Sequence, residues 1–417
     1  MYYFYWVPIG TEASVRRTPY ATIALLVANV AGWLWFSFGS APVDLFYALA
    51  FKPGNPTLLS LVTSSFLHAN LLHLAGNMVF LAALGPALES RIGPARFLLA
   101  YIGCSGLGDL SHATWVLTRQ PELAAAPVVG ASAGISGLLG LILVRLYFVR
   151  IKFASVTMLL LQGVVRPARF SLPAAVAVAL WFLLDLVYLA VDQSSHVATM
   201  AHLSACGFGI ALGFLMGLHA EARLERLVVR GNRYAEQAEW FAALGEYDAY
   251  LQRRPDSAEV LAQAARVHRV TQQEPRALER FRASVHASLA AGDVRAASEI
   301  YEEMRRLLGD ATLHAADLLR LARGLEEAGR PADASRVYEA FGRQYPDRPG
   351  AAAALLKSAA IEERRLNNPG RARFLYQELM ARALPLALEE VVRARARGAE
   401  EALARQLRAG SSALPTP

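Results

Sequence analysis

Residues 66–77 read Phe66-Leu67-His68-Ala69-Asn70-Leu71-Leu72-His73-Leu74-Ala75-Gly76-Asn77 and lead into an apolar segment that continues to about residue 90. Two further polar groups stand at the starts of later apolar segments, Gly130-Ala131-Ser132-Ala133-Gly134 and Ala201-His202. Ionisable side chains are costly inside a membrane span, so their presence there indicates a functional site. A hydroxyl nucleophile and a histidine base are the groups that a serine hydrolase needs.

Six apolar segments are long enough to cross the roughly 30 Å of hydrocarbon in a bilayer. They lie at about residues 21–39, 72–90, 95–117, 131–149, 172–192 and 199–218. The apolar stretch Ser155–Val165 is too short to span and is flanked by basic residues, so we expect it at the membrane interface. With 54% hydrophobic residues, the chain is too apolar for an ordinary soluble protein. The sequence therefore predicts an all-α fold that starts with a six-helix transmembrane bundle.

Basic residues gather in the loops on one side of these predicted spans. They are Arg16 and Arg17, Arg91 and Arg96, the group Arg145, Arg150, Lys152, Arg166 and Arg169, and then Arg223, Arg226 and Arg230. The opposite loops hold little beyond Lys52 and Arg119. Because loops rich in lysine and arginine stay inside, both termini are predicted to be cytoplasmic. Spans two, four and six then run inward, so the three polar groups should lie at one depth near the outer surface.

Small residues form ridges on two of these spans. Ser132, Ser136 and Gly140 repeat every four residues along span four, and Ala205, Gly209 and Gly213 do the same along span six. Such ridges let membrane helices approach closely. If the two ridges meet, Ser132 and His202 face each other within hydrogen-bonding reach.

The chemistry of peptide hydrolysis gives each polar residue a role. A serine hydroxyl becomes a nucleophile when a neighbouring histidine accepts its proton. The tetrahedral oxyanion needs donors, which the backbone N–H of Ser132 at a helix start could supply. His73 and Asn77, one turn apart on span two, could add side-chain donors. No acidic third member is evident, so a Ser132–His202 dyad is the economical prediction.

These residues resemble the rhomboid family of intramembrane serine proteases. The pattern consists of His68-x4-His73-x3-Asn77, Gly130-Ala131-Ser132 and Ala201-His202, with Glu89, Gly93 and Arg96 in support, and it covers about residues 15–218. The resemblance implies that Ser132 is the nucleophile and His202 the base, with His73, Asn77 and the Ser132 amide as the oxyanion hole. It also implies that His68 is a supporting residue near the site. Gly130 in the serine motif and Ala205 and Gly209 on the small-residue face of span six are expected to be supporting residues too.

The family cleaves single-span membrane proteins near the outer face and needs neither a metal nor a nucleotide, so no cofactor is expected. Two positions depart from its pattern. Ala133 follows the serine where many members have glycine, and Ser136 stands where some members have an aromatic residue that stacks on the histidine.

Two other protease chemistries have weaker support in this sequence. Gly106-Leu107-Gly108-Asp109 matches a signature of intramembrane aspartyl proteases, with Asp185 as the second aspartate, but the tyrosine usual before that residue is missing. Both aspartates are better explained as polar packing or interfacial groups, and His112 as an interfacial histidine. No His-Glu-x-x-His motif occurs, and His68 and His73 do not share a helix face well enough for a metal pair.

After about residue 220 the chain becomes rich in arginine, glutamate and alanine. Ala297-x3-Tyr301, Ala334-x3-Tyr338 and Ala372-x3-Tyr376 recur with turns at Gly292, Gly329 and Asn368-Pro369-Gly370, whereas the earlier Ala277-x3-Phe281 breaks the register. Helical hairpins of this kind resemble tetratricopeptide-like (TPR-like) repeats. We therefore predict a protease domain at 1–219, a basic linker at 220–230, a cytoplasmic repeat domain at 231–394, and a charged helix with a disordered tail at 395–417.

The predicted partners are membrane lipids, transmembrane substrates and a protein bound to the repeats. The charges of the repeats are of mixed sign, which argues against nucleic acid. The predicted location is a bacterial inner membrane. Two alternatives remain open: an inactive rhomboid-like protein that binds membrane clients, and a membrane-tethered scaffold whose repeats are the working part. Retention of both Ser132 and His202 favours the enzyme.

Overall fold

The computed structural model describes residues 2–15, 17–159, 164–191, 199–382, 384 and 386–411. The chain divides into two compact units, Met1–Arg226 and Leu227–Pro417. Residues 220–230, predicted as a linker, lie within helix α9 (Leu218–Glu236), and the predicted charged helix from residue 395 is part of α18 (Leu386–Ser411). The tail at 412–417 falls outside the described residues.

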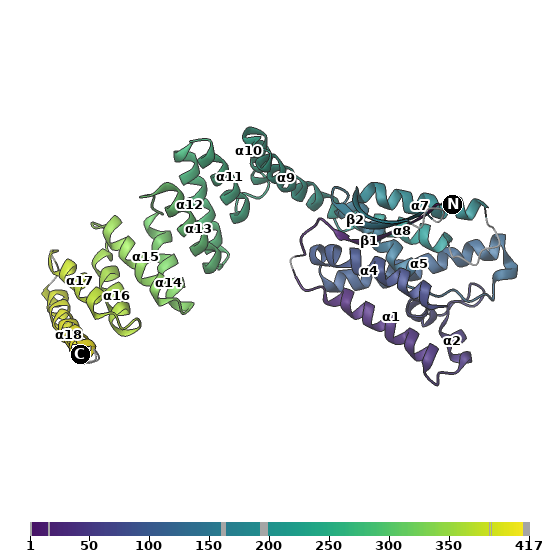
Figure 1. Cartoon of the computed structure of the whole chain (residues 1–417), viewed down its shortest axis with the longest axis horizontal. Coiled ribbons are helices and arrows are strands. Elements are labelled where there is room, and N and C mark those ends of the chain that lie inside the picture. Colours follow the sequence, from purple (N-terminus) through teal and green to yellow (C-terminus); the bar gives the residue numbers. More distant parts are fainter. Residues whose placement is uncertain are drawn as a thin grey trace. The chain divides into compact units, whose positions relative to one another are not determined.

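Six helices of the first unit correspond to the six predicted spans, and Figure 1 shows α1, α4 and α5 within one bundle. They are α1 (Tyr20–Phe38), α4 (Leu71–Ile92), α5 (Pro94–Arg119), α6 (Ser132–Arg145), α7 (Ala174–Val191) and α8 (Thr199–Leu215). The loop between α1 and α4 holds α2 (Val43–Leu49), α3 (Ser60–Thr63) and the 3-10 turn η1 (Ser64–Phe66), and η2 (Pro121–Leu123) follows α5.

Within the described residues, α1 and α4 are the two single helices long and apolar enough to cross a membrane. Helix α8 passes the same test only together with α9, from which it is bent by 77°. Helix α6 and the described start of α7 are apolar but shorter. The chain is thus a membrane protein with two or three clear spans, and six crossings remain a prediction.

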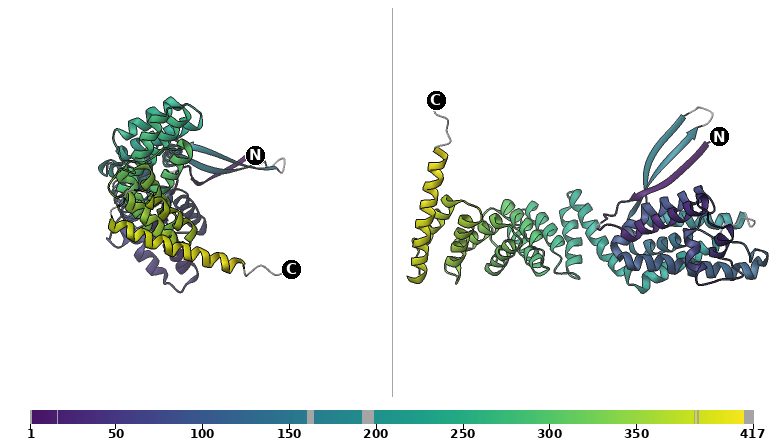
Figure 2. Two further views of the ribbon diagram at one scale, coloured as in Figure 1. Left: turned by 90° about the vertical axis from the view of Figure 1, so that its left-hand side faces the viewer. Right: turned by 90° about the horizontal axis from the view of Figure 1, so that it is seen from below.

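A three-stranded antiparallel sheet corrects the all-α prediction. Strand β1 (Tyr2–Thr11) pairs with β2 (Arg150–Leu159), which pairs with β3 (Val164–Pro173). The described part of the stretch predicted at the interface, Ser155–Val165, therefore lies in two paired antiparallel strands, and both views of Figure 2 show the far ends of these strands extending beyond the helices.

The sheet packs one face against the helical bundle. Ile151 and Phe153 are buried while Lys152 between them is exposed, which is the alternation expected of a strand with one covered face. The Trp6 ring lies 4.9 Å from the Phe153 ring, and Phe153 stacks on Phe170 at 5.3 Å. The sheet therefore joins the N-terminal strand to the segment between α6 and α7.

The carboxylate of Glu89 near the end of α4 caps the start of α1. It accepts hydrogen bonds from the backbone N–H groups of Ala21 (2.9 Å) and Thr22 (2.7 Å) and from the Thr22 hydroxyl (2.7 Å). The first N–H groups of a helix have no partner within the helix, so an outside acceptor is needed. Glu89 is only 3% exposed, and its bonds therefore fasten two helices at one end of the bundle.

Replacing Glu89 with alanine should destabilise the first unit by about 2–3 kcal/mol, because buried backbone N–H groups lose the side chain that accepts their hydrogen bonds. Thermal unfolding of the purified protein in detergent measures the effect. Glu122→Gln, a change at an exposed carboxylate, serves as the control and should leave the midpoint unchanged. Equal unfolding midpoints for Glu89→Ala and wild type would contradict this role of the cap.

Two buried arginines fasten the first turns of α9 to α4 and α6. Arg91 and Arg145 bind Glu225 at 2.8 and 2.7 Å, and Arg145 also lies 3.5 Å from Glu221. Burial alone would raise the pKa of Glu225, but the hydrogen bond from Arg91 and the charge of Arg145 hold it below its ordinary value. Glu225 therefore stays ionised and keeps the basic ends of both helices paired.

The second unit is a row of helices packed side by side (Figure 1). After α9 come α10 (Trp240–Leu251), α11 (Ala258–Val270), α12 (Glu274–Ala290), α13 (Val294–Leu308), α14 (Ala315–Glu327), α15 (Pro331–Gln344), α16 (Ala351–Arg364), α17 (Pro369–Met380) and α18. The repeated alanine and tyrosine anchors on α13, α15 and α17 are at most 2% exposed.

The turns before these anchor helices contain a residue with positive φ. Gly292 (φ +76°) and Gly329 (φ +72°) fill two of them, and Asn367 (φ +49°) fills the third, one residue before the predicted Asn368-Pro369-Gly370. The Asn368 side chain instead accepts a hydrogen bond from the Arg371 backbone N–H and caps α17. The repeating pattern therefore extends through these three hairpins.

Candidate active site

Helices α6 and α8 come together at their small-residue ridges. A Cβ built on Gly209 would lie 2.0 Å from the backbone oxygen of Gly137, and one built on Gly140 would lie 2.2 Å from that of Cys206. A side chain larger than hydrogen therefore has no room at either place. This agrees with the predicted approach of the two ridges.

The close approach brings Ser132 and His202 into contact. Ser132 is the first residue of α6, and its Oγ lies 2.8 Å from Nε2 of His202 on α8. Ala205, one turn below His202, is fully buried and packs with Ala133 and Ala201. The contact between Ser132 and His202 therefore lies at one end of the two packed ridges.

His68, just before α4, and His73 and Asn77 on α4 lie against the segment that leads to Ser132. Nδ2 of Asn77 is 3.0 Å from Nε2 of His68, and the rings of His68 and His73 are 5.1 Å apart. The backbone N–H of Ala131 points at His68 Nε2 at 3.5 Å. His68 thus lies beside both Asn77 and the start of α6.

Gly130 allows this contact because it carries no side chain. It has φ +129°, and a Cβ there would lie 2.7 Å from the His73 ring and 3.6 Å from Nδ2 of Asn77. A positive φ and a close neighbour both favour glycine. His73 and Asn77 therefore reach the backbone two residues before Ser132.

A second, buried chain of contacts supports the same backbone and was not singled out from the sequence. Asp109 on α5 is 3% exposed and accepts a hydrogen bond from the Ser64 hydroxyl at 3.2 Å. The carbonyl of Ser64 in turn accepts from the Gly130 N–H at 2.9 Å. Asp109 thus acts as a packing group that holds the active-site loop, while the side chain of Asp185 is outside the described residues.

Both departures from the expected pattern fit the geometry. Ala133 lies within α6 and is 5% exposed, so its methyl group has a normal helical environment. Ser136 is 2% exposed and no aromatic ring stands at its position. Instead, Tyr101 of α5 fills the space beside Gly134, where a Cβ would lie 2.6 Å from its ring.

His112 is better buried than an interfacial histidine would be. It is 8% exposed and stacks on Trp115 at 6.2 Å, and it lies close enough to His202 for their charges to interact. His112 lies one turn along α5 from Gly108, where α5 touches α8. A prediction of the contact between α5 and α8 would therefore have placed His112 near His202. Sequence reasoning missed that contact because it considered only the ridges on α6 and α8.

The structure thus brings together a hydroxyl, an imidazole, a helix start and two side chains from α4. A hydroxyl hydrogen-bonded to an imidazole is the arrangement of an activated serine nucleophile. Across the described ranges, no three His, Cys, Asp or Glu side chains are grouped as a metal site.

Comparison with known proteins points to one family for the first unit. Residues 55–219 match the model of the rhomboid domain. The chain is 29% identical over 221 residues to "Putative rhomboid protease YdcA" of Bacillus subtilis (strain 168), an alignment that covers 52% of this chain and 95% of that protein. It is 36% identical over 90 residues to "Rhomboid-like protease 3" of Toxoplasma gondii, covering 21% of this chain and 34% of that protein.

Among solved structures, the crystal structure of the P58(IPK) TPR domain aligns with 80% of this chain and 98% of its own length. The identity is 13% and the TM-score is 0.19, so this likeness carries no argument about the fold.

Proposed function

We propose that the protein is an intramembrane serine endopeptidase that uses a Ser132–His202 dyad, since residues 55–219 match the model of the rhomboid domain. The observation that carries the proposal is the 2.8 Å contact between Ser132 Oγ and His202 Nε2. The serine and the histidine come from two different apolar helices. Chance is a poor explanation for a contact between the two residue types that this chemistry needs.

In the first step, Oγ of Ser132 attacks the carbonyl carbon of the scissile peptide bond. Nε2 of His202 accepts the hydroxyl proton as the new C–O bond forms. The carbonyl oxygen becomes an oxyanion, which the backbone N–H of Ser132 and the side chains of His73 and Asn77 stabilise as donors. His202 then gives its proton to the leaving amine, the C–N bond breaks, and an acyl-enzyme remains on Ser132.

In the second step, water replaces the amine. His202 takes a proton from the water, whose oxygen attacks the acyl carbon, and the same donors stabilise the second oxyanion. Collapse of this intermediate returns the proton to Ser132 and releases the new carboxyl end. His68, beside Asn77 and the Ala131 N–H, orients the donors, while Asp109 and Ser64 hold the loop that carries Gly130.

The substrates of this site would be single-span membrane proteins cut near the outer face. The test is reconstitution of the full chain in vesicles with such substrates, followed by mass spectrometry of the products. We expect cleavage within a few residues of the outer end of the substrate span. An intact substrate that co-purifies with the protein would instead support the inactive client-binding alternative and contradict the protease.

Replacing Asn77 with alanine should lower kcat by about 10²–10³-fold, because one donor to the developing oxyanion is lost. The value of KM should change little, since the donor acts mainly in the transition state. Kinetics on the reconstituted substrate measure both constants, and thermal unfolding detects any loss of the contact with His68. A raised KM with an unchanged kcat would contradict the oxyanion role.

The proposed location is a bacterial inner membrane, crossed six times, with both termini in the cytoplasm. The basic loops support this orientation. Reporter tags at residues 120–128 should lie outside, and a tag at Pro417 should lie inside. Tags found on the same side would overturn both the orientation and the common depth of the three polar groups.

The second unit would bind a protein partner or regulate cleavage from the cytoplasm. Its regular hairpins support this role, because arrays of this kind present extended binding surfaces. Its helices are also joined by ion pairs between neighbouring repeats, such as Arg266–Glu303 at 2.7 Å and Arg343–Glu378 at 2.8 Å, which support a stable scaffold.

A further inference from the structure

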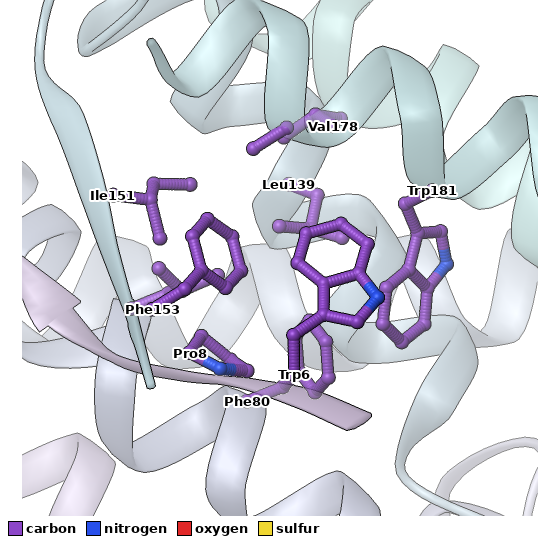
Figure 3. Close-up of a pocket in the computed structure, with 10 residues that line it drawn as sticks. Trp6, Pro8, Phe80, Leu139, Ile151, Phe153, Val178 and Trp181 are labelled. Carbon is purple, nitrogen blue, oxygen red and sulfur yellow. The ribbon is translucent and has the colours of Figure 1, made fainter. Parts of the chain in front are cut away.

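An apolar pocket lies between the sheet and three helices of the first unit. Its volume is about 170 Å³, and its walls come from β1, β2, α4, α6 and α7. Figure 3 shows the rings of Trp6, Phe153 and Trp181 around the same space as the side chains of Leu139 and Val178. Every lining side chain is apolar or aromatic, and none is charged. The pocket is separate from the Ser132–His202 site, because Leu139 lies two turns further along α6.

One wall of the pocket is the middle of a candidate membrane span. Phe80 and Leu84, which line it, stand near the middle of α4, and α4 is one of the two helices in the described residues that are long and apolar enough to cross a membrane alone. At 1.5 Å per residue, Phe80 lies about 13 Å from the start of this helix. Helix α7, on the opposite wall, exposes Leu183 and Val187 on its free surface. With α4 spanning the bilayer, the pocket lies at the depth of the lipid chains.

An empty apolar space of this size is unfavourable, because its lining atoms lack contacts on one side. Water does not fill it well, since an apolar cavity of about 150 Å³ stays dry and binds an apolar molecule of the size of benzene. The apolar molecule available at this depth is a lipid chain. We propose that the pocket binds a segment of one acyl chain of a membrane phospholipid.

The surroundings favour a phospholipid over a peptide segment. The pocket offers no charged side chain to recognise a peptide, and Phe80 and Trp181 close one wall with ring centroids 4.1 Å apart. The sheet also carries cations, of which Lys152 on β2 and Arg169 on β3 are exposed, and these attract anionic headgroups. The bound chain fills the space between α4 and α7 and ties both helices to the N-terminal strand.

The test uses the full chain in vesicles that contain a phospholipid with a diazirine in the middle of one acyl chain. After illumination, mass spectrometry maps the residues that carry lipid. We expect adducts on Trp6, Phe80 and Trp181 in addition to adducts on the lipid-facing Leu183 and Val187. Adducts confined to the lipid-facing residues would overturn the proposal.

Filling the pocket provides the matched comparison. Ala177→Phe places a ring in the space and should abolish the adducts on the lining residues while those on Leu183 and Val187 remain. Val176→Phe changes the neighbouring residue, which is 44% exposed and does not line the pocket, and should leave every adduct in place. Should Ala177→Phe fail to fold, Leu139→Phe fills the space from the opposite wall. Persisting adducts in a folded filled variant would contradict the proposal.

A substrate helix is the alternative occupant. Adding a single-span substrate to the Ser132→Ala variant, which keeps the substrate intact, should leave the lining adducts unchanged. Their loss on addition would show that the pocket receives substrate and would overturn the lipid proposal. The proposal depends on membrane insertion and not on catalysis, so an inactive protein that shows the adducts would leave it standing while the proposed protease fails.

Discussion

Replacing Ser132 with alanine should lower the rate of cleavage of a reconstituted single-span substrate by about 10⁶-fold, leaving only the small rate that the oxyanion donors and substrate binding support. The reason is that the variant retains the helices and the histidine but has no atom to form the acyl-enzyme. His202→Ala should lower the rate by a similar factor, since the effects of substitutions within one catalytic unit are not additive. The measurement is product formation against time at saturating substrate.

The matched control for this substitution is Ser111→Ala. Ser111 lies on α5, and its hydroxyl donates to the Leu107 carbonyl of its own helix at 2.9 Å, away from the site. That variant should cleave at the wild-type rate. Substantial cleavage by Ser132→Ala would mean that another nucleophile does the chemistry.

Gly209→Leu should abolish cleavage as well, although residue 209 touches neither reacting group. Its added Cβ alone would lie 2.0 Å from the backbone oxygen of Gly137, and a backbone atom cannot rotate aside. Overpacking costs typically about 1–3 kcal/mol, with larger values where the backbone has to move. Helices α6 and α8 would separate, and the 2.8 Å contact between Ser132 and His202 would open.

Gly207→Leu is a close control on the same helix. A Cβ on Gly207 meets nothing within 4 Å, so the larger side chain is accommodated at the surface. Its activity and unfolding midpoint should match wild type, while Gly209→Leu loses the activity and unfolds at a lower temperature. Full activity in Gly209→Leu would show that the two ridges do not need to touch.

The six helices of the first unit that correspond to the predicted spans could be predicted from the sequence because each falls within a long apolar run. The approach of α6 and α8 could be predicted too, because small residues every four positions leave a groove that a second helix fills. The number of crossings was harder to establish from length, since α6 has only 14 residues and α8 needs the bent α9 to pass as a span.

The sheet could not be predicted from those signals. Strand β1 at residues 2–11 pairs with β2 at residues 150–159, and nothing local in either stretch indicates a partner so far along the chain. A search for spans also treats Ser155–Val165 as a weak hydrophobic segment. The alternation of Ile151, Lys152 and Phe153 was the available signal, and its period of two residues is that of a strand.

The contacts that support the site could not be predicted from motifs either. Asp109 was considered as a weak protease signature and as a packing group, and its bond to Ser64 depends on a fold that brings α5 beside the turn before α4. His112 lies near His202 for the same reason. Motifs indicate which residues can take part in catalysis. The residues that hold them in position depend on contacts between helices, which motifs do not give.

The central claim is that His202 activates the hydroxyl of Ser132, and covalent labelling with a fluorophosphonate tests it most directly. The probe reacts with an activated serine and needs no knowledge of the substrate. Wild-type protein in detergent should be labelled on Ser132, and neither Ser132→Ala nor His202→Ala should be labelled. Equal labelling of all three proteins would contradict the dyad.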